Sequence, residues 1–133
     1  MPTPNKVSTI LLVEDVEEIR DAAAELLTAD GYRVAPARDE EDAVLRATLQ
    51  PPNILLVNLP GPCPHVVEIA LRIRERAALS QDIPILIFGA DTISEGAELK
   101  IEENIHLISP DNFDQLRKCI GRLLGQFSFP GLG

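Results

Sequence analysis

Apolar residues follow two alternating patterns along the chain. Continuous apolar runs occupy residues 10–13 and 54–57, a run at 83–88 is interrupted only by Pro84 near its start, and a run at 105–108 only by His106. Runs of this length are typical of strands that a sheet buries on both faces. Between the runs, apolar residues recur every three or four positions, which is typical of amphipathic helices. The pattern therefore predicts strands and helices in alternation.

Five strands and five helices are expected. The predicted strands cover residues 10–13, 32–35, 54–57, 83–88 and 105–108, and the predicted helices cover 16–27, 39–49, 66–79, 93–103 and 113–124. Asp15 is placed to cap the first helix, and Gly31 is placed to end it. The fourth helix has the weakest pattern, because Ile93, Ala97 and Ile101 form only a thin apolar stripe.

Strands that alternate with helices in this way form a parallel sheet joined by right-handed crossovers. The predicted fold is α/β, a flavodoxin-like, doubly wound, five-stranded parallel sheet with five helices in three α/β/α layers. Sites in such sheets lie outside the carboxyl ends of the strands. The residues found there are Glu14, Asp15, Asn58, Gly89 and Ser109. No glycine-rich loop follows the first strand, so no motif supports a dinucleotide site or a P-loop.

The length of 133 residues corresponds to one domain, expected at residues 1–126, with 127–133 as a C-terminal tail or the start of a linker. The composition, 45% hydrophobic and 25% charged, is typical of a globular chain. No apolar run approaches the roughly 18 residues of a membrane span, and the N-terminal segment lacks a signal peptide pattern. We therefore expect a cytoplasmic protein that does not cross a membrane.

The formal net charge of −9 would repel a phosphate backbone, and no basic run offsets it. Direct binding of nucleic acid is therefore not expected. Cys63 and Cys119 are far apart and have no metal-like spacing, so we interpret them as two reduced thiols.

Several segments resemble the receiver domains of two-component signalling (CheY-like), from about Ser8 to Gln126. Residues 10–20 are similar to the family's first strand, acidic pair and first helix. Residues 53–62 are similar to the third strand and the loop that carries the phosphoacceptor, with Pro62 at the position of a family proline. Residues 83–90 and 106–110 are similar to the fourth strand and to the segment that ordinarily contains an aromatic residue, two apolar residues, Lys and Pro.

The resemblance implies a role for each residue beyond the strand ends. Glu14 and Asp15 match the two acids that hold a divalent metal, whereas Asn58 occupies the position of the phosphoacceptor Asp. Gly89 replaces the hydroxyl residue that binds the phosphoryl oxygens, and Ser109 replaces the cationic Lys. A neutral carboxamide cannot form an acyl phosphate, so we expect a degenerate pseudo-receiver.

These replacements are consistent with one another. Loss of a carboxylate at Asn58 and of a Lys at Ser109 leaves the formal charge of the site unchanged, which favours natural change over a single engineered substitution. A weakly bound Mg²⁺ at Glu14 and Asp15, or no cofactor, is expected, because Asn58 offers only a neutral oxygen. Asp15 has an alternative role as a helix cap, and Asn58 as a hydrogen-bonding residue of the pocket.

The remaining pocket positions have plain structural interpretations. His106 stands where the family has its aromatic switch residue, and we interpret it as a half-exposed strand residue. His65 and Cys63 are expected in a loop that Pro62 and its neighbouring prolines stiffen.

Two functions from different classes remain. The first is a non-enzymatic protein-interaction module that docks a histidine kinase, an effector or another receiver, or forms a homodimer. Its docking face is expected on the fourth helix, the fifth strand and the last helix, with Ile101 exposed. The second is a small-ligand or metal-binding site, possibly enzymatic, in the acidic pocket. We favour the first, because no nucleophile with a base and no metal triad can be named for the second.

Overall fold

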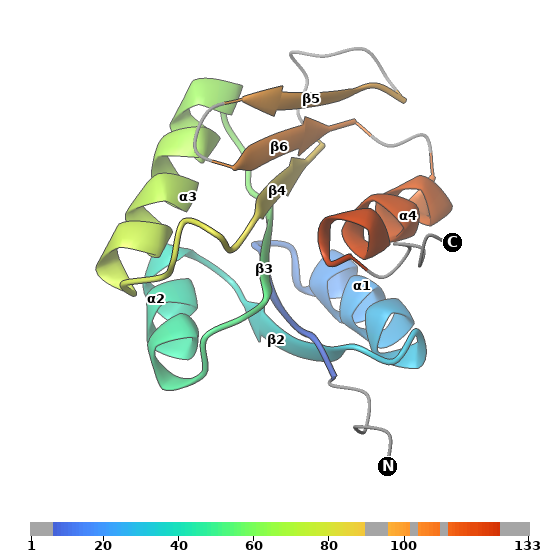
Figure 1. Cartoon of the computed structure of the whole chain (residues 1–133), viewed down its shortest axis with the longest axis horizontal. Helices are drawn as coiled ribbons and strands as arrows, with labels where there is room; N and C mark the ends of the chain where they lie inside the picture. The colour runs from blue at the N-terminus through green and yellow to red at the C-terminus, as the bar shows by residue number, and fades with distance from the viewer. Residues whose placement is uncertain (1–6, 90–95, 102–103, 110–111, 126–133) are drawn as a thin grey trace.

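A six-stranded sheet forms the centre of the computed structural model, which describes residues 7–89, 96–101, 104–109 and 112–125. Its strand order is β2-β1-β3-β4-β6-β5. The strands are β1 (Thr9–Glu14), β2 (Arg33–Ala37), β3 (Ile54–Asn58), β4 (Ile85–Phe88), β5 (Glu98–Ile101) and β6 (Ile105–Ile108). The helices are α1 (Glu17–Ala29), α2 (Glu40–Leu49), α3 (Cys63–Arg76) and α4 (Phe113–Leu123). Helices α1 and α4 cover one face of the sheet, and α2 and α3 cover the other (Figure 1).

The alternation of side chains along the central strands builds one core on each face of the sheet. Leu11 and Leu55 are fully buried towards α2 and α3, whereas Ile10 and Leu56 are fully buried towards α1 and α4. This burial on both faces is the reason for the continuous apolar runs of β1 and β3. The predicted α/β, doubly wound architecture is confirmed, and five of the six strands pair in parallel.

The predicted fourth helix is wrong where the structure describes it, and the five-stranded, five-helix count changes with it. Residues 98–101 form β5, which pairs antiparallel with β6 at the sheet edge. The physical reason is a period of two: Glu98 and Lys100 point to one face, and Leu99 and Ile101 to the other. Residues 96 and 97 of the predicted helix are also described and are not helical, whereas residues 93–95 and 102–103 lie outside the described residues.

Two helix starts also differ from expectation. The N-cap of α1 is Val16, and no side chain caps it, so the predicted cap at Asp15 is wrong. Helix α3 begins at Cys63 with Pro62 as its N-cap, because a proline in the first turn has no amide hydrogen to lose. Cys63 and His65 therefore lie on a helix and not in a loop. At the end of α1, Gly31 has a φ of +100°, as its predicted role requires.

No helix in the described part of the chain is long and apolar enough to cross a membrane. The predicted tail at 127–133 lies outside the described residues.

Asn104 joins the β5–β6 hairpin to the rest of the fold. It has a φ of +60°, a left-handed conformation that asparagine tolerates better than most residues. Its side-chain Nδ2 lies 3.2 Å from the Gln81 carbonyl oxygen and 3.3 Å from that of Asp82, in the segment between α3 and β4. The hairpin is thus held both by its own backbone conformation and by a polar contact to the neighbouring loop.

We expect Asn104→Ala to lower the free energy of unfolding by about 2 kcal/mol, because it adds a left-handed penalty to the lost hydrogen bonds. Asn104→Gly relieves the backbone penalty and should cost about 1 kcal/mol. Urea unfolding of the two variants measures the difference. Equal losses would mean that the left-handed conformation contributes nothing.

Candidate functional site

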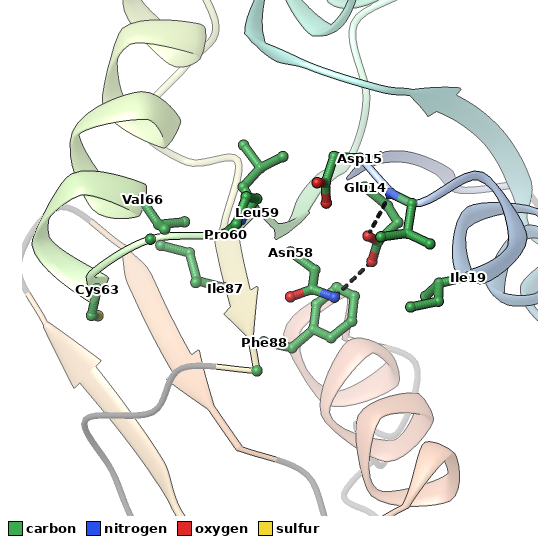
Figure 2. Close-up of a pocket in the computed structure, with 13 residues that line it drawn as sticks. Glu14, Asp15, Ile19, Asn58, Leu59, Pro60, Cys63, Val66, Ile87 and Phe88 are labelled. Carbon is green, nitrogen blue, oxygen red and sulfur yellow. Dashed lines mark hydrogen bonds between the residues drawn. The ribbon is translucent and has the colours of Figure 1, made fainter.

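A pocket of about 360 Å³ opens at the carboxyl ends of β1, β3 and β4. Four of the predicted site residues line it: Glu14, Asp15, Asn58 and Gly89. Apolar side chains make up much of the remaining wall, and those labelled in Figure 2 include Ile19, Leu59, Val66, Ile87 and Phe88. Sequence reasoning named the polar residues and missed this apolar wall. The position of Phe88 in the pocket wall could have been predicted, because this residue ends a strand immediately before Gly89.

Glu14 and Asn58 form the central contact of the pocket. The parallel register of β1 and β3 places the two residues directly beside each other. The Asn58 Nδ2 donates a hydrogen bond of 2.6 Å to Oε1 of Glu14 (Figure 2). The Glu14 Oε2 accepts a second bond of 3.1 Å from the Val16 backbone N–H at the start of α1. Both carboxylate oxygens are therefore engaged by donors of the chain itself.

Glu14 is a buried carboxyl group with an exposed fraction of only 2%. Burial raises its pKa above the ordinary value, and the charge of the adjacent Asp15 raises it further. The hydrogen bonds from Val16 and Asn58 oppose this rise, because both donors favour the ionised form. An Asp at position 58 would remove one of these donors and bring a second carboxylate against the first.

The other end of the Asn58 amide faces Gly89. A Cβ atom built on Gly89 would lie 2.9 Å from the Oδ1 of Asn58, closer than side-chain carbons approach such atoms. Gly89 also has a φ of +79°, which side-chain-bearing residues rarely adopt. The orientation of Asn58 and the glycine at position 89 thus depend on each other.

The oxygen atoms that the pocket offers as metal ligands suit a divalent cation poorly. A hard cation needs several free oxygen atoms, preferably charged, around one point. Here Asn58 directs an N–H towards Glu14, so the amide occupies the place beside the carboxylate that a cation would need. Across the residues that the structure describes, no three His, Cys, Asp or Glu side chains meet in a way that could hold a metal. Asp15 is exposed and is the remaining acid of the pocket.

Three predicted pocket positions are not part of the described lining: Ser109, His106 and Pro62. Pro62 nevertheless stands between Gly61 and Cys63, which are part of it. The backbone N–H of Ser109 bonds to the carbonyl of Ala97 beside β5, so this residue continues the hairpin. His106 is half-buried opposite Lys100, as the plain interpretation expected. Its burial and the positive charges of Lys100 and Arg122 lower its pKa.

The two cysteines are buried free thiols. Cys63 contributes to the pocket wall at the start of α3. Burial raises the pKa of Cys119 to about 11, and this residue lies on α4, away from the pocket. Arg20 contacts the Glu14 backbone, because its Nη1 donates a bond of 2.8 Å to the Glu14 carbonyl oxygen. It ties α1 to the end of β1.

We expect the stability of Glu14→Gln relative to the wild type to depend on pH. The folded-state pKa of Glu14 is raised, so its ionisation destabilises the fold at neutral pH, and this penalty disappears as pH falls towards the ordinary value of 4.5. The wild type should therefore gain stability relative to the variant between pH 7 and pH 4.5. Urea unfolding at several pH values measures the trend, with Glu17→Gln as the control for net charge. A difference that stays constant, or moves towards the variant, would contradict the raised pKa.

No protein-family model matches the chain. A curated relative, response regulator RR06 of Streptococcus pneumoniae serotype 2, is 25% identical over 120 residues, which is 89% of this chain and 54% of RR06. The chain therefore spans about half the length of this relative.

Solved structures of receiver domains have the same fold. The receiver domain of the hybrid histidine kinase CckA is 25% identical, with a TM-score of 0.62 over 87% of this chain and 98% of that domain. The response regulator TrrA of Thermotoga maritima, solved with Mg²⁺-BeF, is 20% identical, with a TM-score of 0.67 over 88% of this chain and 99% of TrrA. TrrA in complex with the histidine kinase ThkA gives a TM-score of 0.68 at 21% identity, over 89% of this chain and 99% of the matched chain. The strand order, the pocket at the strand ends and these similarities together show that the chain has the CheY-like receiver fold and is similar to response regulators.

Proposed function

We propose that this receiver domain acts in two-component signalling without accepting a phosphoryl group, as a non-enzymatic protein-interaction module. The observation that carries the proposal is the hydrogen bond of 2.6 Å from Asn58 to Glu14. In this arrangement the residue at the phosphoacceptor position is a neutral donor that satisfies a buried carboxylate. It has no nucleophilic oxygen to offer to a phosphoryl donor.

The surroundings of Asn58 support the same proposal. Gly89 has no hydroxyl to bind phosphoryl oxygens, and its contact with the Asn58 Oδ1 leaves little room for one. Ser109 lies outside the described lining of the pocket and carries no charge. Transfer of a phosphoryl group needs positive charge and donors around the developing negative charge. Neither residue provides a positive charge, and Gly89 provides no side-chain donor.

An exposed apolar groove between α1 and α4 supports the interaction role. Its volume is about 310 Å³, and its lining is almost entirely apolar, with Ile19, Leu26, Phe88 and Phe113 among the residues. Ile19 and Leu26 are 48% and 49% exposed, although their helical spacing predicted burial. Exposed apolar surface between two helices suits the apolar face of a partner helix.

A histidine kinase is the partner that we propose for this groove. The support is the similarity to TrrA, which has been solved in complex with the histidine kinase ThkA. The docking face expected from the sequence changes, because β5 stands in place of residues 98–101 of the predicted fourth helix. Ile101 is half-buried against the core, so the expectation that it is exposed is wrong. Leu99 is the exposed apolar residue of that strand.

We expect the chain to stay unmodified when it is incubated with acetyl phosphate and Mg²⁺, because Asn58 has no carboxylate.

The variant Asn58→Asp should be phosphorylated at least about a hundredfold more slowly than TrrA assayed in parallel, since Gly89 and Ser109 do not stabilise the transferred charge. Intact-mass spectrometry measures both reactions. A phosphoryl group mapped to residues 53–64 of the wild type would refute the phosphorylation-independent role.

We expect Leu26→Asp to weaken binding to a histidine kinase by at least about tenfold, because it places a charge in the apolar groove. The matched control is Leu45→Asp on α2, where the leucine is 58% exposed outside the groove. Binding of both variants to a panel of purified histidine kinases from the source organism can be measured by biolayer interferometry. If both variants bind as the wild type does, the groove is not the docking site. If instead Glu14→Gln alone abolishes binding, the acidic pocket takes its place.

A further inference from the structure

Strand β5 is a short strand at the edge of the sheet (Figure 1). Among the described residues, β5 pairs only with β6, in the register that sets Glu98 opposite Ile108 and Lys100 opposite His106. An edge strand has one row of backbone groups that its own sheet leaves unpaired. Such a row can pair with a strand of another chain.

The register identifies which residues present this row. The Ser109 N–H donates to the Ala97 carbonyl at 3.1 Å, so Ala97 directs its backbone groups towards β6. In an antiparallel ladder, successive residues direct these groups to opposite sides. Leu99 and Ile101 therefore face β6, whereas the N–H and C=O groups of Glu98 and Lys100 point to the free edge.

The side chains of β5 make this edge self-complementary. When a second copy of the strand is paired antiparallel about Leu99, Glu98 of each copy lies opposite Lys100 of the other. The pairs Glu98–Lys100 are then the hydrogen-bonded pairs, because these residues have the free backbone groups. The two Leu99 side chains lie opposite each other at the centre, and each is 48% exposed in the single chain.

The neighbouring antiparallel registers are unfavourable. Centring the pair on Glu98 places two carboxylates opposite each other, and centring it on Lys100 places two ammonium groups opposite each other. Like charges directly opposite in a sheet are destabilising. A lysine on an edge strand commonly discourages pairing with foreign strands, and here the same lysine has a matching acid in one register only.

Contacts within the chain keep Glu98 in place for this pairing. Arg122 on α4 donates to the Oε1 of Glu98, which fixes that carboxylate on the α4 side of the sheet. Its side chain still has an exposed fraction of 38%, so oxygen lone pairs remain accessible. Lys100 lies on the same face, above His106.

From the free backbone row and the matched charges, we propose that two copies of this chain associate through β5, antiparallel about Leu99, to form one continuous sheet. The proposal rests on the proposed function as an interaction module and names one of its partners, a second copy. It uses neither the acidic pocket nor the groove between α1 and α4. The two proposals are therefore tested by different measurements: self-association tests β5, and kinase binding tests the groove.

The test is sedimentation equilibrium of the full chain over a concentration series. The wild type should show a monomer–dimer equilibrium. Lys100→Glu should weaken dimerisation by about tenfold or more, because both cross-strand pairs become Glu–Glu pairs. Lys118→Glu makes the same charge change at an exposed position on α4 and should leave the dimer unchanged. A wild type that stays monomeric, or equal effects of the two substitutions, would overturn the proposal.

A second test of the β5 dimer exchanges the charges of Glu98 and Lys100 between two variants. Glu98→Lys alone should also lose self-association, because its edge carries only lysines. An equimolar mixture of Glu98→Lys and Lys100→Glu restores opposite charges in both pairs and should form a heterodimer. No association in a mixture of two folded variants, as judged by circular dichroism, would overturn the proposal. If Glu98→Lys does not fold, the comparison of Lys100→Glu with Lys118→Glu decides alone. Leu26→Asp should leave dimerisation unchanged, which separates this surface from the groove.

Discussion

The parallel register of β1 and β3 is the constraint on which the site depends. It places the last residue of each strand side by side, so Glu14 and Asn58 are in contact whatever else surrounds them. A buried carboxylate needs donors, and the Asn58 amide and the Val16 N–H provide them. The same bonds connect β1, β3 and the start of α1. Asn58 is therefore a structural member of the site as well as part of its wall.

The sequence was sufficient to predict the sheet and the polar half of the pocket. Continuous apolar runs mark the strands buried on both faces, and the rule that sites lie beyond strand ends brings Glu14, Asp15, Asn58 and Gly89 together. Helical periodicity was a poorer guide, because it specifies one side of a helix and not what covers that side. Ile19 and Leu26 keep the spacing of a buried face, yet they remain half exposed beside α4.

The strand at the edge of the sheet could not be predicted from the sequence. A strand of four residues is too short for a periodic pattern to separate period two from a helical stripe, especially where only Leu99 and Ile101 are apolar. Pairing with β6 decides the structure, and that interaction is tertiary. Ser109 shows the same limit, because its backbone bond to Ala97 places it with the hairpin and not with the pocket.

The contact between Asn58 and Gly89 also limits how the two positions can vary. With Asn58 in place, any side chain at position 89 meets the amide oxygen, and the backbone there is in a conformation that favours glycine. A hydroxyl residue placed at position 89 alone therefore clashes with Asn58. An aspartate placed at position 58 alone sets two carboxylates against each other, because Glu14 is its neighbour. Positions 58 and 89 thus form one steric unit, in which a larger residue at position 89 is accommodated only when Asn58 is replaced or moves.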